Sequence, residues 1–136
     1  MKFGNQISFL FGDDRKHADF KKTYSNVLEA HMLVKEQVKS GMTGGDADAI
    51  ARNHFQKFGL DKLFTHSLGH GIGINIHEFP RLSPKSDDKL INGMVFSDEP
   101  GVYLAGEYGI RIEDTIMLDK DKVISLTDSD KKLIIL

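Results

Sequence analysis

The apolar residues in the first half of the chain recur at spacings that place them along one side of a helix. Between residues 19 and 39 they lie three, four or seven residues apart, and lysine and glutamate fill the positions between them. This pattern is typical of an amphipathic helix with one buried stripe. The apolar positions of the stripe are Phe20, Tyr24, Val27, Leu28, Val34 and Val38. Gly41 follows as a natural C-terminal stop.

A second helix is predicted over residues 46–58. Its apolar positions again repeat with helical spacing, and Gly59 is expected to end it. Thr43 or Asp46 is suited to cap the start, since a short side-chain oxygen can accept a hydrogen bond from a free backbone N–H of the first turn.

The residue pattern changes after Leu63, where short segments rich in isoleucine and valine are separated by glycine, proline and aspartate. Such segments are typical of β-strands. The predicted strands are residues 72–77, 94–98, 101–104, 109–118 and 122–126. A further strand is predicted before the helices, at residues 7–11, and the polar residues 83–89 are predicted to form a surface loop.

The order of the elements is one strand, two helices and then several strands. This order favours an α+β fold in which two helices pack on a mainly antiparallel sheet. A length of 136 residues indicates a single domain with room for a core.

Composition narrows the functional classes. The chain is 40% hydrophobic and 28% charged, with a net charge of −2, so it lacks the basic surface that nucleic acid or an anionic membrane would need. We find no apolar run long enough for a membrane helix and no secretory signal. The absence of cysteine fits a cytoplasmic location and leaves His, Asp and Glu as the available metal ligands.

Three of the six histidines fall within twelve residues, at His66, His70 and His77. Imidazoles at these spacings can meet in one pocket across a loop and a strand. The alternative is that each histidine is hydrogen-bonded in a glycine-rich turn and chemically inert.

Glycines surround His70 at every second position, at Gly69, Gly71 and Gly73. In a strand or tight turn, glycines at this spacing let a neighbouring backbone, a substrate or an ion approach closely. They do not match the dinucleotide-binding pattern, because the wider glycine spacing and the following helix are both missing.

Two glutamates, Glu99 and Glu113, occur in apolar strand contexts. Alternation along a strand puts Arg111 and Glu113 on one face, with Ile110 and Ile112 on the other. A buried glutamate is unfavourable unless it is paired or bound to a metal. A salt bridge from Arg111 to either glutamate is one explanation. A site for Zn, Mn, Co or Fe built from imidazole and carboxylates is the other.

The same residues lie in three ordered motifs that resemble the pita-bread metallopeptidases, the family of methionine aminopeptidase, aminopeptidase P and prolidase. The motifs are His66-x-x-x-His70-Gly-Ile-Gly with His77-Glu78-x-Pro80, then Gly93-Met-Val-x-x-x-Glu99-Pro-Gly-x-Tyr103, then Gly109-x-Arg111-Ile-Glu113-Asp114. The resemblance covers about residues 12–126. The segment from Glu99 to Tyr103 is closer to the prolidase and aminopeptidase P branch, which implies hydrolysis of the bond between an N-terminal residue and proline.

The resemblance also implies a role for each residue. His70, Glu99 and Glu113 would be metal ligands, for Mn, Co or Zn, in a site that is dinuclear in the family. Glu99 would also act as general base. His66 and His77 would contact a proline-containing dipeptide or peptide, or stabilise the tetrahedral intermediate, and Arg111 would orient the carboxylates or bind the substrate carboxylate.

One departure from the family pattern concerns the remaining ligands. The family completes its site with two aspartates on a hairpin just before the first long helix, and no aspartate precedes Asp13 here. We therefore expect residues 1–136 to be a single, partial catalytic domain, the C-terminal portion of the pita-bread fold, without the N-terminal domain or the aspartate hairpin. Activity of the chain alone is expected to be weak or absent.

The missing strands would leave an exposed sheet edge, so we expect a homodimer or a complementary chain. The alternative function is a non-catalytic binding module on the same fold, for which eroded ligands would be expected.

Overall fold

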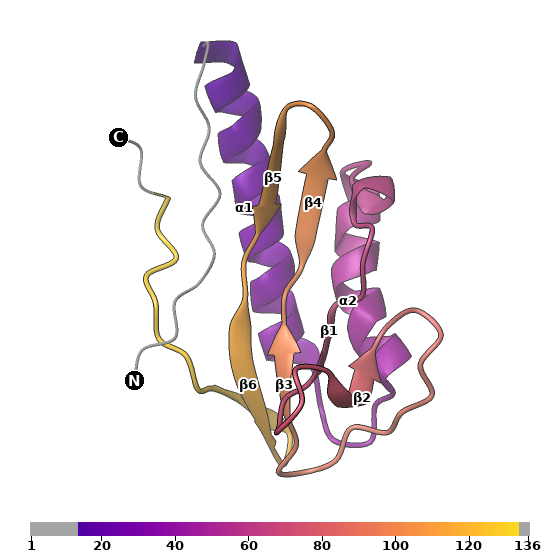
Figure 1. The fold of residues 1–136 in the computed structure, drawn as a ribbon. Helices are drawn as coiled ribbons and strands as arrows, with labels where there is room; N and C mark the ends of the chain where they lie inside the picture. Colours follow the sequence, from indigo (N-terminus) through magenta and orange to yellow (C-terminus); the bar gives the residue numbers. More distant parts are fainter. Residues whose placement is uncertain (1–13, 134–136) are drawn as a thin grey trace.

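The computed structural model describes residues 14–133, with side chains from residue 18 onward (Figure 1). Two helices, α1 (Asp14–Gln37) and α2 (Gly44–Lys57), pack against each other and against the strands. Every strand pairing is antiparallel. The predicted α+β arrangement is therefore confirmed. No helix in the described part of the chain is both long and apolar enough to cross a membrane.

Helix α1 matches the amphipathic pattern of the sequence, although it begins earlier than residue 19 and ends two residues before 39. The predicted stripe is its inner face. Phe20, Tyr24, Val27 and Val34 are buried, as is Val38 just after the helix end, and Leu28 packs against them from a half-buried position. Gly41 has a φ of +91°, a left-handed conformation that favours glycine and ends the helical path.

Helix α2 begins with both of the predicted capping residues in use. Thr43 is the N-cap, its side chain accepts a hydrogen bond from the Asp46 N–H at 3.0 Å, and the Asp46 carboxylate accepts one from the Thr43 N–H at 2.8 Å. This reciprocal pair is a capping box. The backbone N–H of Thr43, and after it the Thr43 side chain, stabilise the ionised Asp46 carboxylate and lower its pKa below the usual range.

The main sheet has the strand order β2-β1-β3-β6-β7, and a separate hairpin pairs β4 with β5. The bounds are β1 Gly69–Gly71, β2 Glu78–Leu82, β3 Val95–Asp98, β4 Gly101–Leu104, β5 Tyr108–Arg111, β6 Asp114–Asp119 and β7 Lys122–Ser125. A short 3-10 helix, η1 (Asp61–Leu63), joins α2 to β1. The strands predicted at 94–98, 101–104 and 122–126 are confirmed, as is the loop at 83–89.

The strand predicted at residues 72–77 is wrong. These residues form the connection between β1 and β2, and Ile74 and Ile76 face outward with 101% and 80% of their surface exposed. Alternation of isoleucine therefore did not mark a buried face. The strand that exists, β2, was missed because it contains Pro80, which an edge strand tolerates.

The strand predicted at 109–118 is two strands. Ile112 and Glu113 separate β5, which pairs with β4, from β6, which pairs with β3. The Ile112 N–H bonds to the Pro100 carbonyl at 3.2 Å, so the chain crosses from the hairpin to the main sheet at this point. The predicted strand at 7–11 lies outside the described residues.

One apolar cluster joins the inner faces of the helices to the strands. Its largest fully buried side chains include Phe55 of α2, Phe96 of β3 and Ile116 of β6. The strands that carry the candidate site are thus supported from the helix side by close packing, which holds side-chain positions.

Thr43→Ala removes the side-chain half of the capping box. We expect the free energy of unfolding to fall by about 1 kcal/mol, the usual effect of losing an N-cap oxygen, as measured by urea denaturation. The NMR-measured pKa of Asp46 should rise part of the way to its ordinary value, since the backbone bond remains. Any stabilisation by ionised Asp46 is present above that ordinary pKa and lost as pH falls through the lowered one.

Thr43→Ser is the matched control, because serine keeps the oxygen that accepts the bond from Asp46. If Thr43→Ser were as unstable as Thr43→Ala, the capping role of the Thr43 oxygen would be contradicted.

Candidate functional site

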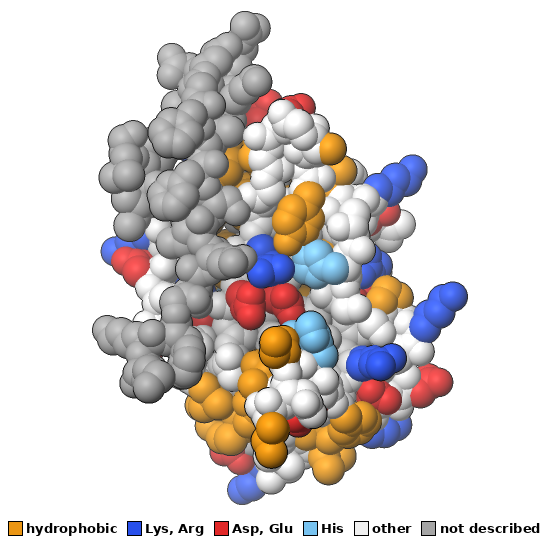
Figure 2. Space-filling model, viewed as in Figure 1, with side chains coloured by type: hydrophobic (Ala, Val, Ile, Leu, Met, Phe, Trp, Pro, Cys, Tyr) orange, Lys and Arg blue, Asp and Glu red, His pale blue; other side chains and the backbone are white. Residues whose placement is uncertain are grey.

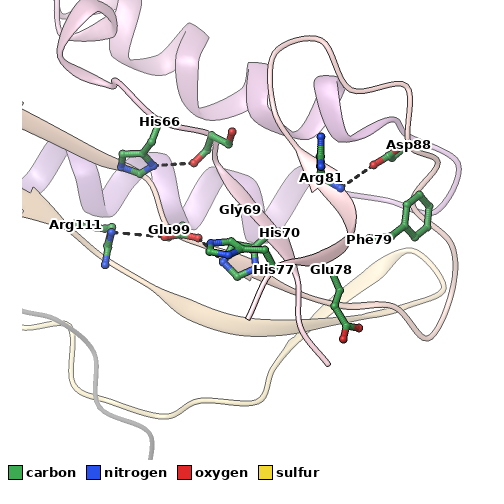
Figure 3. A pocket seen from close by; sticks show the side chains of 11 residues that line it. His66, Gly69, His70, His77, Glu78, Phe79, Arg81, Asp88, Glu99 and Arg111 are labelled. Carbon is green, nitrogen blue, oxygen red and sulfur yellow. Dashed lines mark hydrogen bonds and ion pairs between the residues drawn. The ribbon is translucent and has the colours of Figure 1, made fainter. Parts of the chain in front are cut away.

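A cavity of about 810 Å³ opens beside the ends of β1 and β3 (Figure 3). Acidic, histidine and basic side chains gather near the middle of the face shown in Figure 2. The lining residues are His66, Ser67, Gly69, His70, His77, Glu78, Phe79, Arg81, Asp88, Glu99 and Arg111. Five of the six predicted site residues are therefore brought to one cavity. Glu113 is not among the lining residues and joins them through Arg111.

The glycines around His70 allow β1 to lie between its two neighbours. A Cβ atom on Gly69 would overlap the carbonyl oxygen of Ser97, and one on Gly71 would overlap the carbonyl oxygen of Phe79. The predicted close approach is therefore that of neighbouring backbone on both sides. It carries His70 to the strand end where Glu99 follows β3.

His70 and Glu99 face each other across the cavity floor. His70 Nε2 lies 3.3 Å from Glu99 Oε1, and Nδ1 lies 3.0 Å from the Gly71 carbonyl oxygen. Because a carbonyl oxygen can only accept, we assign a proton to Nδ1. Nε2 then needs a positive charge between itself and the carboxylate, either its own second proton or a metal ion.

Ser97 of β3 is hydrogen-bonded to both of these residues. Its hydroxyl donates to Glu99 Oε1 at 2.8 Å and accepts from the His70 backbone N–H at 3.0 Å. The Glu99 side chain is 12% exposed, so it is held at the edge of the cavity with little freedom.

Arg111 lies between the two glutamates. Its Nη1 is 3.8 Å from Glu99 Oε2 and its Nε is 3.5 Å from Glu113 Oε2. Both of the salt bridges considered from the sequence are thus present. Burial nevertheless raises the pKa of the Glu113 carboxyl, and the nearby charge of Glu99 raises it further. The two carboxylates remain a repelling pair.

The other two histidines flank this centre. The rings of His77 and His70 lie 4.3 Å apart, centroid to centroid, and His77 is exposed. His66 Nδ1 lies 2.8 Å from the Ser67 carbonyl oxygen, and its ring packs against Tyr103. Figure 3 shows His66 and His77 on different sides of Glu99, so a ligand in the cavity could touch both.

The site also depends on a pair of residues in α2 that sequence reasoning missed. Arg52 binds both oxygens of Asp48, at 2.8 and 3.1 Å, and donates to the carbonyls of Phe64 and His66 at 3.0 and 3.1 Å. Asp48 in turn accepts from the Leu68 N–H at 3.1 Å. The pair fixes the segment that carries His66. Its only sequence signal was the i,i+4 spacing, which is common on helices.

The donor set at the centre fits a divalent cation in part. Imidazole with carboxylates suits Zn, Mn or Co, and a metal-bound histidine commonly donates its other N–H to a backbone carbonyl, as His70 does. Among residues 18–133, however, no group of three or more His, Asp and Glu side chains is drawn together to hold an ion. The residue types therefore suit a divalent cation, but fewer than three of them converge on one point among the described residues.

Comparison with known proteins identifies relatives over most of the chain. The sequence profile of metallopeptidase family M24 matches residues 6–120. An Xaa-Pro dipeptidase of Pyrococcus horikoshii is 43% identical over 114 residues, which is 84% of this chain and 32% of that protein.

Solved structures agree with this similarity. A prolidase from Thermococcus sibiricus superposes with a TM-score of 0.84 and 43% identity, over 88% of this chain and 32% of that one. An X-prolyl aminopeptidase from Caenorhabditis elegans, described as a cytosolic enzyme with a di-nuclear active site, has a TM-score of 0.71 and 30% identity, over 80% of this chain and 20% of that one. The chain spans about a third of the length of the curated relatives it matches.

Arg52→Leu removes the donors that hold the segment carrying His66. We expect the free energy of unfolding to fall by about 1.5–3 kcal/mol, the usual contribution of hydrogen bonds to charged groups. The amide of Leu68 should exchange faster with deuterium, because its acceptor Asp48 loses its own partner.

Gln56→Lys, an exposed change one turn further along α2, is the control and should leave both measurements unchanged. Unaltered Leu68 protection in Arg52→Leu would show that Asp48 holds the segment without Arg52.

Proposed function

The chain belongs to metallopeptidase family M24, and from this membership we propose that it provides the catalytic face of an Xaa-Pro peptidase, which hydrolyses the bond between an N-terminal residue and proline. The membership confirms the resemblance predicted from the three motifs. The two helices on an antiparallel sheet likewise confirm the predicted pita-bread fold, which the prolidase structures share.

The observation that carries the proposal is the contact between His70 Nε2 and Glu99 Oε1. His70 Nε2 faces a Glu99 oxygen at 3.3 Å while Nδ1 is directed to a carbonyl, so an unprotonated Nε2 and the carboxylate would together supply two ligands of a cation site. Glu113 would add a second carboxylate. We therefore assign His70, Glu99 and Glu113 as ligands of Mn, Co or Zn in the loaded protein.

A bound divalent ion would polarise the scissile carbonyl and increase the acidity of a water molecule. The side chains of this chain would do the rest. Glu99 would accept a proton from the attacking water, a role supported by the position of its carboxylate at the cavity edge. His66 and His77 would contact the substrate or stabilise the tetrahedral intermediate, and Arg111 would orient the two carboxylates or bind a substrate carboxylate.

Full loading of the site would require the two aspartates that the family places before its first helix. His70, Glu99 and Glu113 alone would give a weaker, single-ion site, since three protein ligands can hold one catalytic ion. A cytoplasmic location and association with a second copy or a complementary chain stay predictions. Such a partner would cover exposed apolar residues such as Ile74 and Phe79.

Metal titration of the chain, followed by calorimetry, tests the ligand assignment. We expect Mn²⁺ or Zn²⁺ to bind, and Glu99→Gln or Glu113→Gln to weaken binding by at least ~10-fold, as loss of groups at metal sites generally does. Glu107→Gln, in the β4–β5 turn away from the cavity, is the control and should bind like the parent chain. Equal binding by Glu99→Gln would remove Glu99 from the ligand set.

Hydrolysis tests the enzymatic role. Proline release from an Xaa-Pro dipeptide is measured for the chain alone and with a polypeptide that supplies the two-aspartate hairpin of a relative. We expect metal affinity and proline release to rise together when the hairpin is supplied. If the hairpin restores no metal binding, the peptidase interpretation fails. If metal binds tightly but no proline is released, the non-catalytic binding module is the better description.

A further inference from the structure

A buried histidine lies directly behind the strands that carry the two glutamates of the site. His31 of α1 has no exposed surface, and each of its ring nitrogens faces an aspartate. Nδ1 lies 2.9 Å from Asp98 Oδ2, and Nε2 lies 3.0 Å from Asp114 Oδ2. Neither aspartate lines the cavity, so the function proposed above does not use this cluster.

The two aspartates need a positive charge between them. Asp98 and Asp114 are register partners across β3 and β6, and their side chains are 0% and 1% exposed. Like charges directly opposite on paired strands repel, and burial strengthens the repulsion because little water screens it. His31 lies between the carboxylates, and its positive charge when protonated would offset their mutual repulsion.

The partners of the two aspartates are unequal. Asp114 also accepts hydrogen bonds from Lys35 at 3.2 Å, Lys131 at 2.9 Å and Thr127 at 2.7 Å. Within the described residues, the ion pair with His31 is the only one that Asp98 makes, and neither Asp98 oxygen has an aligned hydrogen bond. Asp98 therefore depends on His31 far more than Asp114 does.

Each aspartate is the chain neighbour of a site glutamate. Asp98 precedes Glu99, and Asp114 follows Glu113. Neighbouring residues in an extended chain point to opposite faces, so the aspartates face α1 and the glutamates face the cavity side. A change in the spacing of the aspartates would be passed to the glutamates through one peptide bond on each strand.

We propose that His31 is a positioning residue that holds Asp98 and Asp114 together on the inner face of the β3–β6 pair and thereby sets the spacing of Glu99 and Glu113 at the site. The importance of that spacing rests on the proposed function. The His31–aspartate geometry does not.

The charges in the cluster agree with this role. Burial lowers the pKa of His31, but its pairing with Asp114 and Asp98 outweighs that effect and raises the pKa overall. Burial raises the pKa of Asp98, and His31 opposes the increase. A buried ion group of this kind is weak evidence for stability, because apolar replacements are often as stable. The role of the His31–aspartate group is therefore better explained by the strand spacing that it sets than by stability.

The first test is a double-mutant cycle with His31→Gln and Asp98→Asn, followed by urea denaturation. Glutamine removes the charge of His31, and asparagine removes the charge that needs it. If the two residues act as a pair, the double variant should lose ~10-fold less in its folding equilibrium constant than the product of the single-variant losses. Independent effects of the two substitutions would overturn the pairing.

The second test reads the site itself. In the metal-free protein, the side-chain carboxyl ¹³C shifts of Glu99 and Glu113 should both change in His31→Gln and return toward the parent values in the double variant. Val27→Ala, a buried change one turn earlier on α1, is the control. It should reduce stability without moving either shift. Unchanged glutamate shifts in His31→Gln would overturn the positioning role.

If His31→Gln does not fold, the parent protein still provides a test. Both ring nitrogens of His31 should show ¹⁵N shifts of protonated or hydrogen-bonded nitrogen at neutral pH, and a free, unbonded nitrogen would overturn the proposal. None of these measurements uses added metal or substrate. A failure of the positioning role is therefore distinguishable from a failure of the peptidase function.

Discussion

The antiparallel pairing of β3 with β6 is the constraint on which the rest of the site depends. It sets Asp98 opposite Asp114, and it makes Glu99 and Glu113 leave the same end of the pair toward the cavity. Four carboxylates are thereby gathered around one strand end. Repulsion within such a group would separate the strands if nothing positive lay on either face. Most of the polar contacts near this point serve to supply that positive charge.

The glycines of β1 meet a second requirement, that an imidazole reach the same strand end. β1 is three residues long and is hydrogen-bonded on both sides, to β2 and to β3. A side chain at Gly69 or Gly71 would overlap neighbouring backbone, so small residues there bring His70 close to Glu99. The histidine-rich segment was recognisable from sequence because close packing requires its glycines and because its histidines are spaced closely enough to share a pocket.

Sequence was sufficient where the information is local. Helical periodicity predicted both helices, and alternation correctly placed Arg111 and Glu113 away from the buried Ile110 and Ile112. Prediction from sequence failed where the residues that contact each other are far apart in the chain. Nothing near Glu113 indicates that the chain changes sheets there. His31 and Asp114 are 83 residues apart, so no motif links them. The exposed isoleucines of 72–77 misled the strand prediction because alternation reports a buried face only when something covers it.

Each face of the β3–β6 pair carries two neighbouring carboxylates that repel each other, and different positive groups lie beside them on the two faces. On the inner face the two aspartates are buried; His31 lies between them, and two lysines add positive charge beside Asp114. On the cavity face Arg111 reaches both glutamates, but only at 3.8 and 3.5 Å, and it leaves them repelling each other. The cavity face therefore keeps two carboxylates close together at the edge of the cavity, while His31 bridges the two aspartates on the opposite face of the same strand pair.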